Sequence, residues 1–313
     1  MRKNSFLILL SYLTIYIVWG STYFFIKMAV ETIPPFYVVG FRWLFGGVLI
    51  GGFAVLAGRL KRRPTVKEIG ASALLGFLLL FGGNGLISVA ERKVDSYLVA
   101  LVLASTPVFV GFFDWLLFRK RLTVFNSLGI FVGITGVAFL LYNGKSIGSS
   151  LTPDLLLVIC GLLVWSFATS LGHKLKVYPD NLVNSSIQML IVGFGCLLGM
   201  AFTEPSLAQL LTEVSFSSLM GLCYLAVVGS LAFCAYTYLI ANEPAVRISS
   251  YAFVNPLIAT FLGLVIGKET PTPFLFYGLP LILTGLLLMI HGESFYKSLR
   301  NLLSNKRKVE LDE

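Results

Sequence analysis

The sequence predicts an all-α integral membrane protein with ten transmembrane helices, arranged as two inverted five-helix repeats. Three observations lead to this prediction. The mean hydropathy is +0.86 and only 12% of the residues are charged, whereas soluble chains contain about 25% charged residues. Apolar runs long enough to cross a bilayer recur along the whole chain. One long stretch of the sequence also occurs twice.

The repeated stretch covers residues 107–136, which align with residues 256–285. Seven of these thirty positions are identical, where composition alone gives about two. The identities include Pro107 with Pro256, Gly129 with Gly278 and Gly136 with Gly285. An internal repeat of this length indicates two similar structural units. We expect them at residues 7–143 and 154–291, joined near 143–153 and followed by a mixed-charge cytoplasmic tail at 292–313.

Ten apolar runs approach the roughly 20 residues that a membrane-spanning helix needs. They cover residues 6–28, 36–57, 69–90, 96–118, 124–142, 154–172, 181–202, 216–240, 246–267 and 273–291. The first run follows Arg2 and Lys3 as a signal peptide does. It is too long for a typical signal sequence and lacks a small-residue cleavage site, so we predict a helix there.

The distribution of Lys and Arg predicts the orientation. If the N-terminus is cytoplasmic, most cations fall in inner segments, such as residues 59–67, 119–121 and the tail. This pattern places both termini in the cytoplasm, and it accounts for the net charge of +9 without a nucleic-acid partner. Five helices in each half is an odd number, so the second half must enter the membrane inverted relative to the first.

The repeated stretch also indicates where a binding site lies. Pro107 and Pro256 fall inside apolar runs and free the backbone carbonyls of Leu103 and Ala252. Such breaks belong in the protein interior or beside a wet cavity, and Ser105, Thr106 and Asn255 stand close enough to satisfy them. A purely structural kink is the alternative. The pair favours a substrate site at the middle of the membrane.

Other polar and aromatic residues inside the predicted spans extend this candidate site. Trp19 and Trp165 occupy nearly equivalent positions in the two halves, although Trp also favours the headgroup region of a membrane. Asn84 lies too deep for that location. The candidate substrate-binding residues are Trp19, Tyr23, Asn84, Thr106, Pro107, Trp165, Tyr236, Tyr251, Asn255 and Pro256.

Charged residues inside the spans are few. Arg42 either extends toward the outer surface or faces the cavity, and the sequence weighs these equally. For Asp114, an ion pair with Arg119–Arg121 is favoured over proton relay. Spacings of four between glycines, as in Gly47/Gly51, Gly129/Gly133 and Gly195/Gly199, predict closely packed helices, within one subunit rather than at a dimer seam. Enzyme signatures are missing, so we expect no catalytic residue, metal or cofactor.

The sequence resembles the EamA-type transporters of the drug/metabolite transporter superfamily. The resemblance rests on WGSTYFFIKMAVETIPPF (19–36), FRWLFGG (41–47), NGLISVAERKVDSYLVALVLASTPVF (84–109) and SYAFVNPLIATFLGLVIGKETPT (250–272). It implies ten helices, inverted repeats and a central cavity lined by helices one, three, four, six, eight and nine. The Gly-Glu that such families carry after the proline helix is replaced by Arg119-Lys120 in the first half and by Lys268-Glu269 in the second.

These observations predict a multi-pass secondary transporter of the cell membrane that moves a small organic solute, such as an amino acid or related metabolite, by alternating access. The resemblance alone favours export. Because no carboxylate stands at mid-span, we expect a neutral or zwitterionic substrate. The alternatives are a membrane-embedded enzyme acting on a lipid-linked substrate, which would need paired carboxylates or a metal motif, and a non-transporting membrane subunit. The expected partners are the solute and the lipid bilayer, and the oligomeric state is left open.

Overall fold

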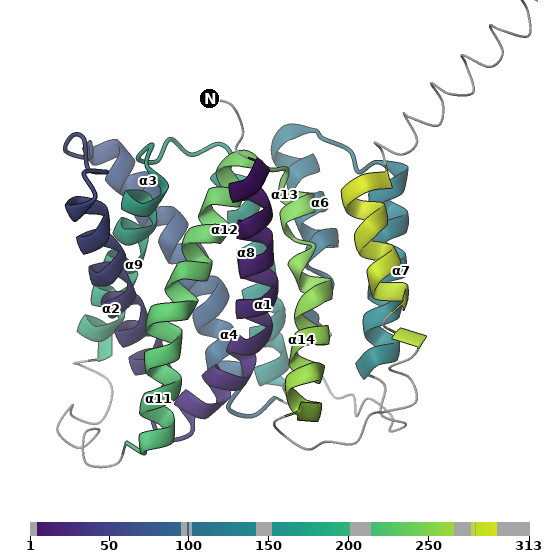
Figure 1. Ribbon diagram of the computed structural model, residues 1–313, viewed down its shortest axis with the longest axis horizontal. Coiled ribbons are helices and arrows are strands. Elements are labelled where there is room, and N and C mark those ends of the chain that lie inside the picture. Colours follow the sequence, from purple (N-terminus) through teal and green to yellow (C-terminus); the bar gives the residue numbers. More distant parts are fainter. Residues whose placement is uncertain are drawn as a thin grey trace, which may run out of the picture.

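The computed structural model describes residues 5–94, 99, 102–141, 152–200, 214–265, 277–278 and 280–292. The regular structure of these residues is helical, and the helices run up and down past one another in a bundle (Figure 1). Most of the segment expected to join the two halves, and the expected tail, lie outside the described residues.

Helices of the first half begin with α1 (Ser5–Val30) and α2 (Pro35–Leu56). Pro35 opens α2, where the proline ring fits because the first turn has no backbone acceptor for its missing N–H. The next crossing combines α3 (Val66–Gly76), the π-helical segment η1 (Phe77–Gly83) and α4 (Asn84–Ala90). A capping box of Thr65 and Glu68 starts it. It is followed by α6 (Thr106–Phe118) and α7 (Val124–Leu141).

The second half follows the same order of elements. It contains α8 (Pro153–Gly172), α9 (Asn181–Met200), α11 (Phe216–Tyr224), the π-helical segment η2 (Leu225–Gly229), α12 (Ser230–Asn242), α13 (Ala245–Ile248), α14 (Tyr251–Val265) and a last helix at Pro280–Gly292. Within the described residues a helix therefore occupies part of each of the ten predicted runs. Six helical stretches are both long and apolar enough to cross a membrane: 5–30, 35–56, 66–90, 153–172, 181–200 and 216–242.

A reciprocal contact joins the two halves where α2 packs along α9. A Cβ atom placed on Gly47 would lie within 3.0 Å of Met189 and Leu190, and one placed on Gly193 would lie within 2.9 Å of Trp43 and Leu44. Trp43, Leu44 and Gly47 precede Met189, Leu190 and Gly193 by the same 146 positions that separate Trp19 from Trp165. Each half therefore presents the same small residue to the same place on the other half, as at a self-complementary interface.

The glycines of the repeated stretch form a second reciprocal contact. Gly129 lies against the Gly285 carbonyl and Gly136 against the Gly278 carbonyl, with added Cβ atoms only 2.8 and 2.9 Å from those oxygens. These four residues are the identical pairs that revealed the repeat. The predicted close packing is confirmed at Gly47, Gly129 and Gly133, but it is wrong for Gly195 and Gly199, where an added Cβ atom would have no neighbour within 4 Å because both residues border an open apolar cavity.

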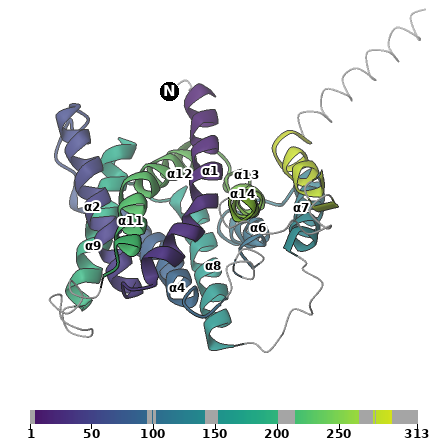
Figure 2. The same ribbon diagram turned by 60° about the horizontal axis from the view of Figure 1, so that its bottom comes forward.

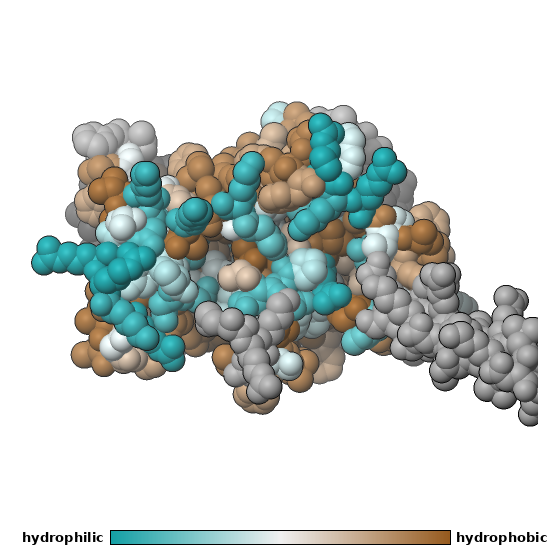
Figure 3. All heavy atoms as spheres, turned by 90° about the horizontal axis from the view of Figure 1, so that it is seen from above, coloured by the Kyte–Doolittle hydropathy of each residue, from teal (hydrophilic) through white to brown (hydrophobic). Residues whose placement is uncertain are grey.

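The surface of the bundle matches a membrane environment. Large apolar side chains such as Phe6, Phe45, Phe53 and Phe131 are more than half exposed on the helix sides, which is costly in water and favourable in lipid. Figure 3 views the end of the bundle where α1 begins, and hydrophilic side chains spread across that end. Figures 1 and 2 both show α1 next to α12 and α14, so a first-half helix runs along second-half helices.

Candidate functional site

A cavity of about 70 Å³ lies in the interior of the bundle, where helices of both halves meet. Its walls come from α1, α2, α4, α6, α8, α12 and α14. The lining residues are Trp19, Thr22, Tyr23, Ile26, Arg42, Trp43, Asn84, Ile87, Leu103, Thr106, Leu162, Trp165, Phe233, Tyr251 and Asn255. Aromatic surface with a few hydroxyl, amide and guanidinium groups is the usual composition of a site for small organic molecules.

Two π-helical segments flank this region. The first, η1, ends at Gly83 and is followed by Asn84, and the second, η2, ends at Gly229 and is followed by Ser230. The two segments start 148 positions apart, so they occupy matching places in the two halves. A π-helical turn changes the direction of the side chains that follow it and occurs frequently at functional sites. In the first half it turns Asn84 toward the cavity.

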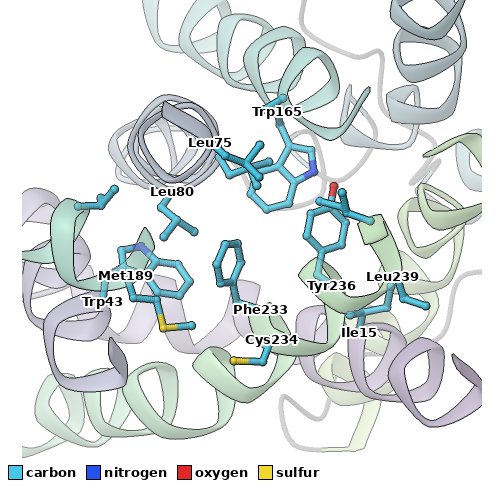
Figure 4. Close-up of a cluster of buried hydrophobic side chains, with 14 of the residues drawn as sticks. Ile15, Trp43, Leu75, Leu80, Trp165, Met189, Phe233, Cys234, Tyr236 and Leu239 are labelled. Atoms are coloured by element: carbon cyan, nitrogen blue, oxygen red, sulfur yellow. The ribbon is translucent and has the colours of Figure 1, made fainter. Parts of the chain in front are cut away.

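Trp19 forms the centre of the aromatic wall. Its ring centroid lies 5.4 Å from that of Trp165, 4.7 Å from that of Tyr236 and 4.9 Å from that of Tyr251, within the range of favourable aromatic pairs. Figure 4 shows Trp165 and Tyr236 next to each other, with Phe233 between them and Trp43. These rings fill most of the space, so the cavity is smaller than the roughly 300–1,000 Å³ of a ligand pocket. Admission of a solute requires the rings to separate.

The first proline break is satisfied as predicted. The Thr106 hydroxyl donates a hydrogen bond to the Leu103 carbonyl at 2.5 Å, which is the carbonyl that Pro107 leaves without its helical partner. The helix α6 restarts at Thr106, with Pro107 in its first turn. Thr106 itself lines the cavity, so the break and the cavity coincide.

The second break differs from the prediction. Pro256 lies inside α14, and the interruption occurs earlier, at Ser249 and Ser250 between α13 and α14. The Asn255 side chain hydrogen-bonds to Tyr23 and not to the freed backbone carbonyl, and its Oδ1 atom has no hydrogen-bond partner within the part of the chain that the structure describes. The residue is only 2% exposed and borders the cavity. Its carbonyl group is therefore available to a ligand.

The structure brings seven of the ten candidate residues together in one cavity: Trp19, Tyr23, Asn84, Thr106, Trp165, Tyr251 and Asn255. The other three do not line it. Tyr236 lies behind Trp19, with its hydroxyl 2.5 Å from the Thr169 hydroxyl. Pro107 and Pro256 shape the helices beside the cavity without reaching it.

Sequence reasoning left the position of Arg42 open, and the structure decides it. The side chain is 2% exposed and lines the cavity, so it does not extend to the membrane surface. Its Nη1 atom donates a hydrogen bond to Oδ1 of Asn84 at 3.2 Å, and its Cζ atom stands 4.2 Å from the ring centroid of Trp43. The cavity therefore contains a cation, which the sequence did not assign to it.

A buried carboxyl group, Glu91, was missed. It follows α4 and is 4% exposed, and neither oxygen has a hydrogen-bond partner within the described ranges. Burial raises the pKa of Glu91 to about 8, while the charges of Arg42 and Lys27 act to lower it. Its side chain borders a second cavity, of about 580 Å³, together with Lys27, Glu31 and Arg92. Asp114, in contrast, lacks the predicted ion pair, because no cation of the described residues lies within 4 Å of it.

Hydrogen bonds close the bundle at the end where α1 begins. The hydroxyl groups of Tyr16 and Ser250 lie 2.7 Å apart, which links α1 to the α13–α14 break. Nearby, Nε2 of His173 at the end of α8 lies 2.8 Å from the Glu243 carbonyl. Glu243 also pairs with Arg247 at 3.0 Å. Both links join segments far apart in the sequence, so opening this end requires them to break.

Comparison with known families agrees with this architecture. The model of the EamA-like transporter family matches residues 6–142 and 152–291. The chain belongs to this family. Its two matches cover nearly all of the described helices, so transport across a membrane is the activity class of the protein.

The relatives support the same class. The Escherichia coli K12 protein described as the uncharacterized inner membrane transporter YedA is 33% identical, and the alignment covers 90% of both chains. The Bacillus subtilis protein described as the uncharacterized transporter YvbV is 26% identical, over 92% of both chains. A crystal structure with 18% sequence identity superposes with a TM-score of 0.71, covering 90% of this chain and 96% of the other, which shows a shared fold.

Proposed function

We propose that this EamA-like transporter is a secondary carrier, in which the central cavity binds a small organic solute and alternating access releases it on the other side. The observation that carries the proposal is the convergence of both halves on one cavity. Trp19, Asn84 and Thr106 come from the first half, and Trp165, Tyr251 and Asn255 come from the second. A site between two repeats is the arrangement that alternating access requires.

The proposed architecture is ten helices in two inverted repeats, with both termini in the cytoplasm. Gly47 of α2 packs against α9, and Gly193 of α9 packs against α2. Together with the contact of Gly129 with Gly285, these reciprocal contacts support a two-fold relation between the halves. The basic segments 59–67, 119–121 and 174–176 follow α2, α6 and α8 at the end of the bundle where α1 begins. This is the hydrophilic end in Figure 3, so that end is the cytoplasmic one under this proposal. In this orientation the hydrogen bond between Tyr16 and Ser250 closes the cytoplasmic end of the bundle.

The proposed direction is export. In the described conformation the cavity is small and the inner end is held by the Tyr16–Ser250 hydrogen bond, so an exporter must break this bond before it loads. A proteoliposome efflux assay tests transport. Vesicles are loaded with amino acids, nucleosides and sugars, and the external medium is analysed by mass spectrometry over time. We expect saturable release of one solute class, inhibited by an unlabelled competitor.

Asn255→Ala provides the site-specific control for this assay. The substitution removes an amide whose oxygen has no protein partner within the described residues and one side-chain hydrogen bond to Tyr23, so we expect the protein level in the membrane to stay near normal. We expect flux to fall about tenfold, the value of one lost hydrogen bond of about 1.4 kcal/mol. Flux at the parental rate in both Asn255→Ala and Asn84→Ala would place the substrate site elsewhere. Unsaturable conductance would indicate a pore.

A further inference from the structure

The guanidinium group of Arg42 is held by elements of both halves. Asn84, directly after η1, accepts the hydrogen bond from Nη1 at 3.2 Å. Gly229, the last residue of η2, leaves space for Nη2, because a Cβ atom there would lie 3.3 Å from it. The Trp43 ring lies 4.2 Å from Cζ. Both π-helical segments therefore contribute to the placement of one cation at the cavity wall.

No negatively charged side chain of the described residues contacts the Arg42 guanidinium group. No carboxylate of the described residues lies within 4 Å of Arg42, and its buried Nε atom has no hydrogen-bond partner there. Burying an arginine without such partners is expensive, because its hydration is lost without replacement. Of its five N–H donors, one has a described acceptor, and Arg42 is one of the residues that line the cavity.

Glu91 does not occupy these donors. The two groups interact electrostatically, yet Glu91 borders the separate cavity near Lys27 and Arg92, whereas Arg42 borders the central one. Glu91 therefore leaves the hydrogen-bonding groups of Arg42 open.

We propose that Arg42 binds an anionic group, a carboxylate, of the transported solute. Guanidinium groups bind carboxylates through paired, charge-assisted hydrogen bonds. The free Oδ1 of Asn255 and the Thr106 hydroxyl border the same cavity and take the neutral polar groups of the solute. The rings of Trp19, Trp165 and Tyr251 pack on its apolar part. This inference rests on the proposed function and narrows the expectation of a neutral or zwitterionic solute to a solute that carries a carboxylate.

The competing explanation is a purely structural arginine that ties α2 to α4. Three probes of the same shape separate the two explanations: benzoate is anionic, benzamide is neutral and benzamidine is cationic. Each is titrated against the purified full chain in detergent, and the midpoint of thermal unfolding is measured. A ligand that binds only the folded state raises this midpoint with concentration. We expect benzoate to do so at concentrations at least tenfold below those of benzamide, and benzamidine to have no effect.

Substitutions of Arg42 test whether this residue causes the preference for benzoate over benzamide. Arg42→Gln has a precedent within the chain, because Gln188 stands 146 positions later, at the matching place of the second half. It should weaken benzoate binding at least tenfold and leave benzamide binding unchanged, whereas Arg42→Lys should retain part of the preference. Arg62→Gln serves as the matched control, because Arg62 is exposed at the bundle end and pairs with Glu68.

Three results would overturn the proposal: no stabilisation by benzoate, equal affinities for benzoate and benzamide in the parental protein, or a benzoate preference that survives Arg42→Gln. If Arg42→Gln does not fold, the comparison of the three probes on the parental protein and on Arg42→Lys still decides it. None of these results contradicts the proposed transport. Transport fails on a different observation, the lack of saturable solute flux in proteoliposomes.

Discussion

The two halves share a backbone design but differ in their buried charges. Each half contains a π-helical segment, η1 or η2, directly before a polar residue. At positions related by 146, the first half has Arg42, Asn84 and Glu91, whereas the second half has Gln188, Ser230 and Thr237. All six side chains are buried or line the cavity. The repeat therefore supplies a symmetric frame, and one half of it carries the charge.

Two of the neutral residues of the second half form hydrogen bonds with neighbouring side chains. Nε2 of Gln188 donates to Asn184 within the same helix, and the hydroxyl of Thr237 lies 2.6 Å from that of Ser185. Both halves leave buried polar atoms open: in the second half these are neutral, Oε1 of Gln188 and Oγ of Ser230, whereas in the first half they belong to ionisable groups, Nε of Arg42 and both oxygens of Glu91. Open buried polar atoms are costly for stability, and residues retained at such a cost are candidates for function.

The largest effect is expected when the two residues after the π-helical segments are compared. Asn84→Ala removes the described acceptor of Arg42. Because hydrogen bonds to charged groups contribute about 1.5–3 kcal/mol, solute flux should fall at least tenfold. Ser230→Ala removes a buried hydroxyl that has no described partner, so its flux should stay within about twofold of the parental rate. Initial efflux rates from proteoliposomes, normalised to reconstituted protein, measure both. Equal losses would contradict the asymmetry between the halves.

The glycines that end the segments provide a second comparison, of stability. A Cβ atom on Gly83 would lie 2.7 Å from Cε3 of Trp165, whereas one on Gly229 would meet only the flexible end of Arg42 at 3.3 Å. Gly83→Ala should destabilise the protein by about 1–3 kcal/mol through overpacking, which lowers the unfolding midpoint by about 2–4 °C per kcal/mol. Gly229→Ala should keep the midpoint within about 1 °C but weaken benzoate binding. A thermal-unfolding midpoint as low as that of Gly83→Ala would show that Gly229 is a packing position.

The pH dependence of stability tests the buried carboxyl group of the first half, Glu91, which has no titratable counterpart at the matching position of the second half. Burial raises the pKa of Glu91 to about 8, above the value near 4.3 expected in an unfolded chain. Between these values the folded protein binds the additional proton, so stability falls as the pH rises from about 5 to 8. Glu91→Gln should flatten this part of the profile, measured as the unfolding midpoint against pH. The groups that act on Glu91 are Arg42 and Lys27, and Tyr23 interacts with it from α1.

Thr237→Val is the matched control for Glu91→Gln, because Thr237 occupies the corresponding position in the second half. The substitution removes the hydrogen bond to Ser185 without removing a titratable group. It should lower the midpoint by a similar amount at every pH. If Glu91→Gln left the slope between pH 5 and 8 unchanged, the buried carboxyl would not be the group responsible.

The sequence was sufficient for the helices and for most of the cavity wall. Hydropathy located the runs, because residues that face lipid or the protein interior are mostly apolar. The matching positions of Trp19 and Trp165 indicated a shared site, which they form with their ring centroids 5.4 Å apart. The glycine spacing predicted that helices pack closely near Gly129. It did not predict that Gly285 is the contact, because a sequence repeat does not show which helices meet.

The burial of the charged residues Arg42 and Glu91 could not be predicted from hydropathy or from the repeat. In α2, where nearly every residue other than Arg42 is apolar, the sequence does not show which face is buried, because lipid and protein interior select the same residues. Arg42 was therefore left open. Glu91 precedes Arg92 and Lys93 and looks like part of a solvated turn, and its burial depends on neighbours that are distant in sequence, such as Lys27. The π-helical segments have no sequence rule beyond a concentration of glycine at Gly82 and Gly83.

The smallest effect is expected at the closure beside the α13–α14 break. Tyr16 bonds to Ser250 at 2.7 Å, whereas the positions 146 residues away from them, Leu162 and Ala104, are apolar. Only the end of the bundle at Tyr16 can therefore be held by this pair of hydroxyls. Tyr16→Phe removes one neutral hydrogen bond, worth about 0.5–1.5 kcal/mol, and keeps the ring.

This change should shift the balance toward the state open at that end by about 2–10-fold. If loading from that side limits export, efflux at low solute concentration should rise by a similar factor and saturate at a lower concentration. Ser250→Ala should have the same effect, and the double variant should add little, because both single variants break one bond. Additive effects in the double variant would mean that Tyr16 and Ser250 act through separate contacts, and the hydrogen bond between them would then not be what keeps this end closed.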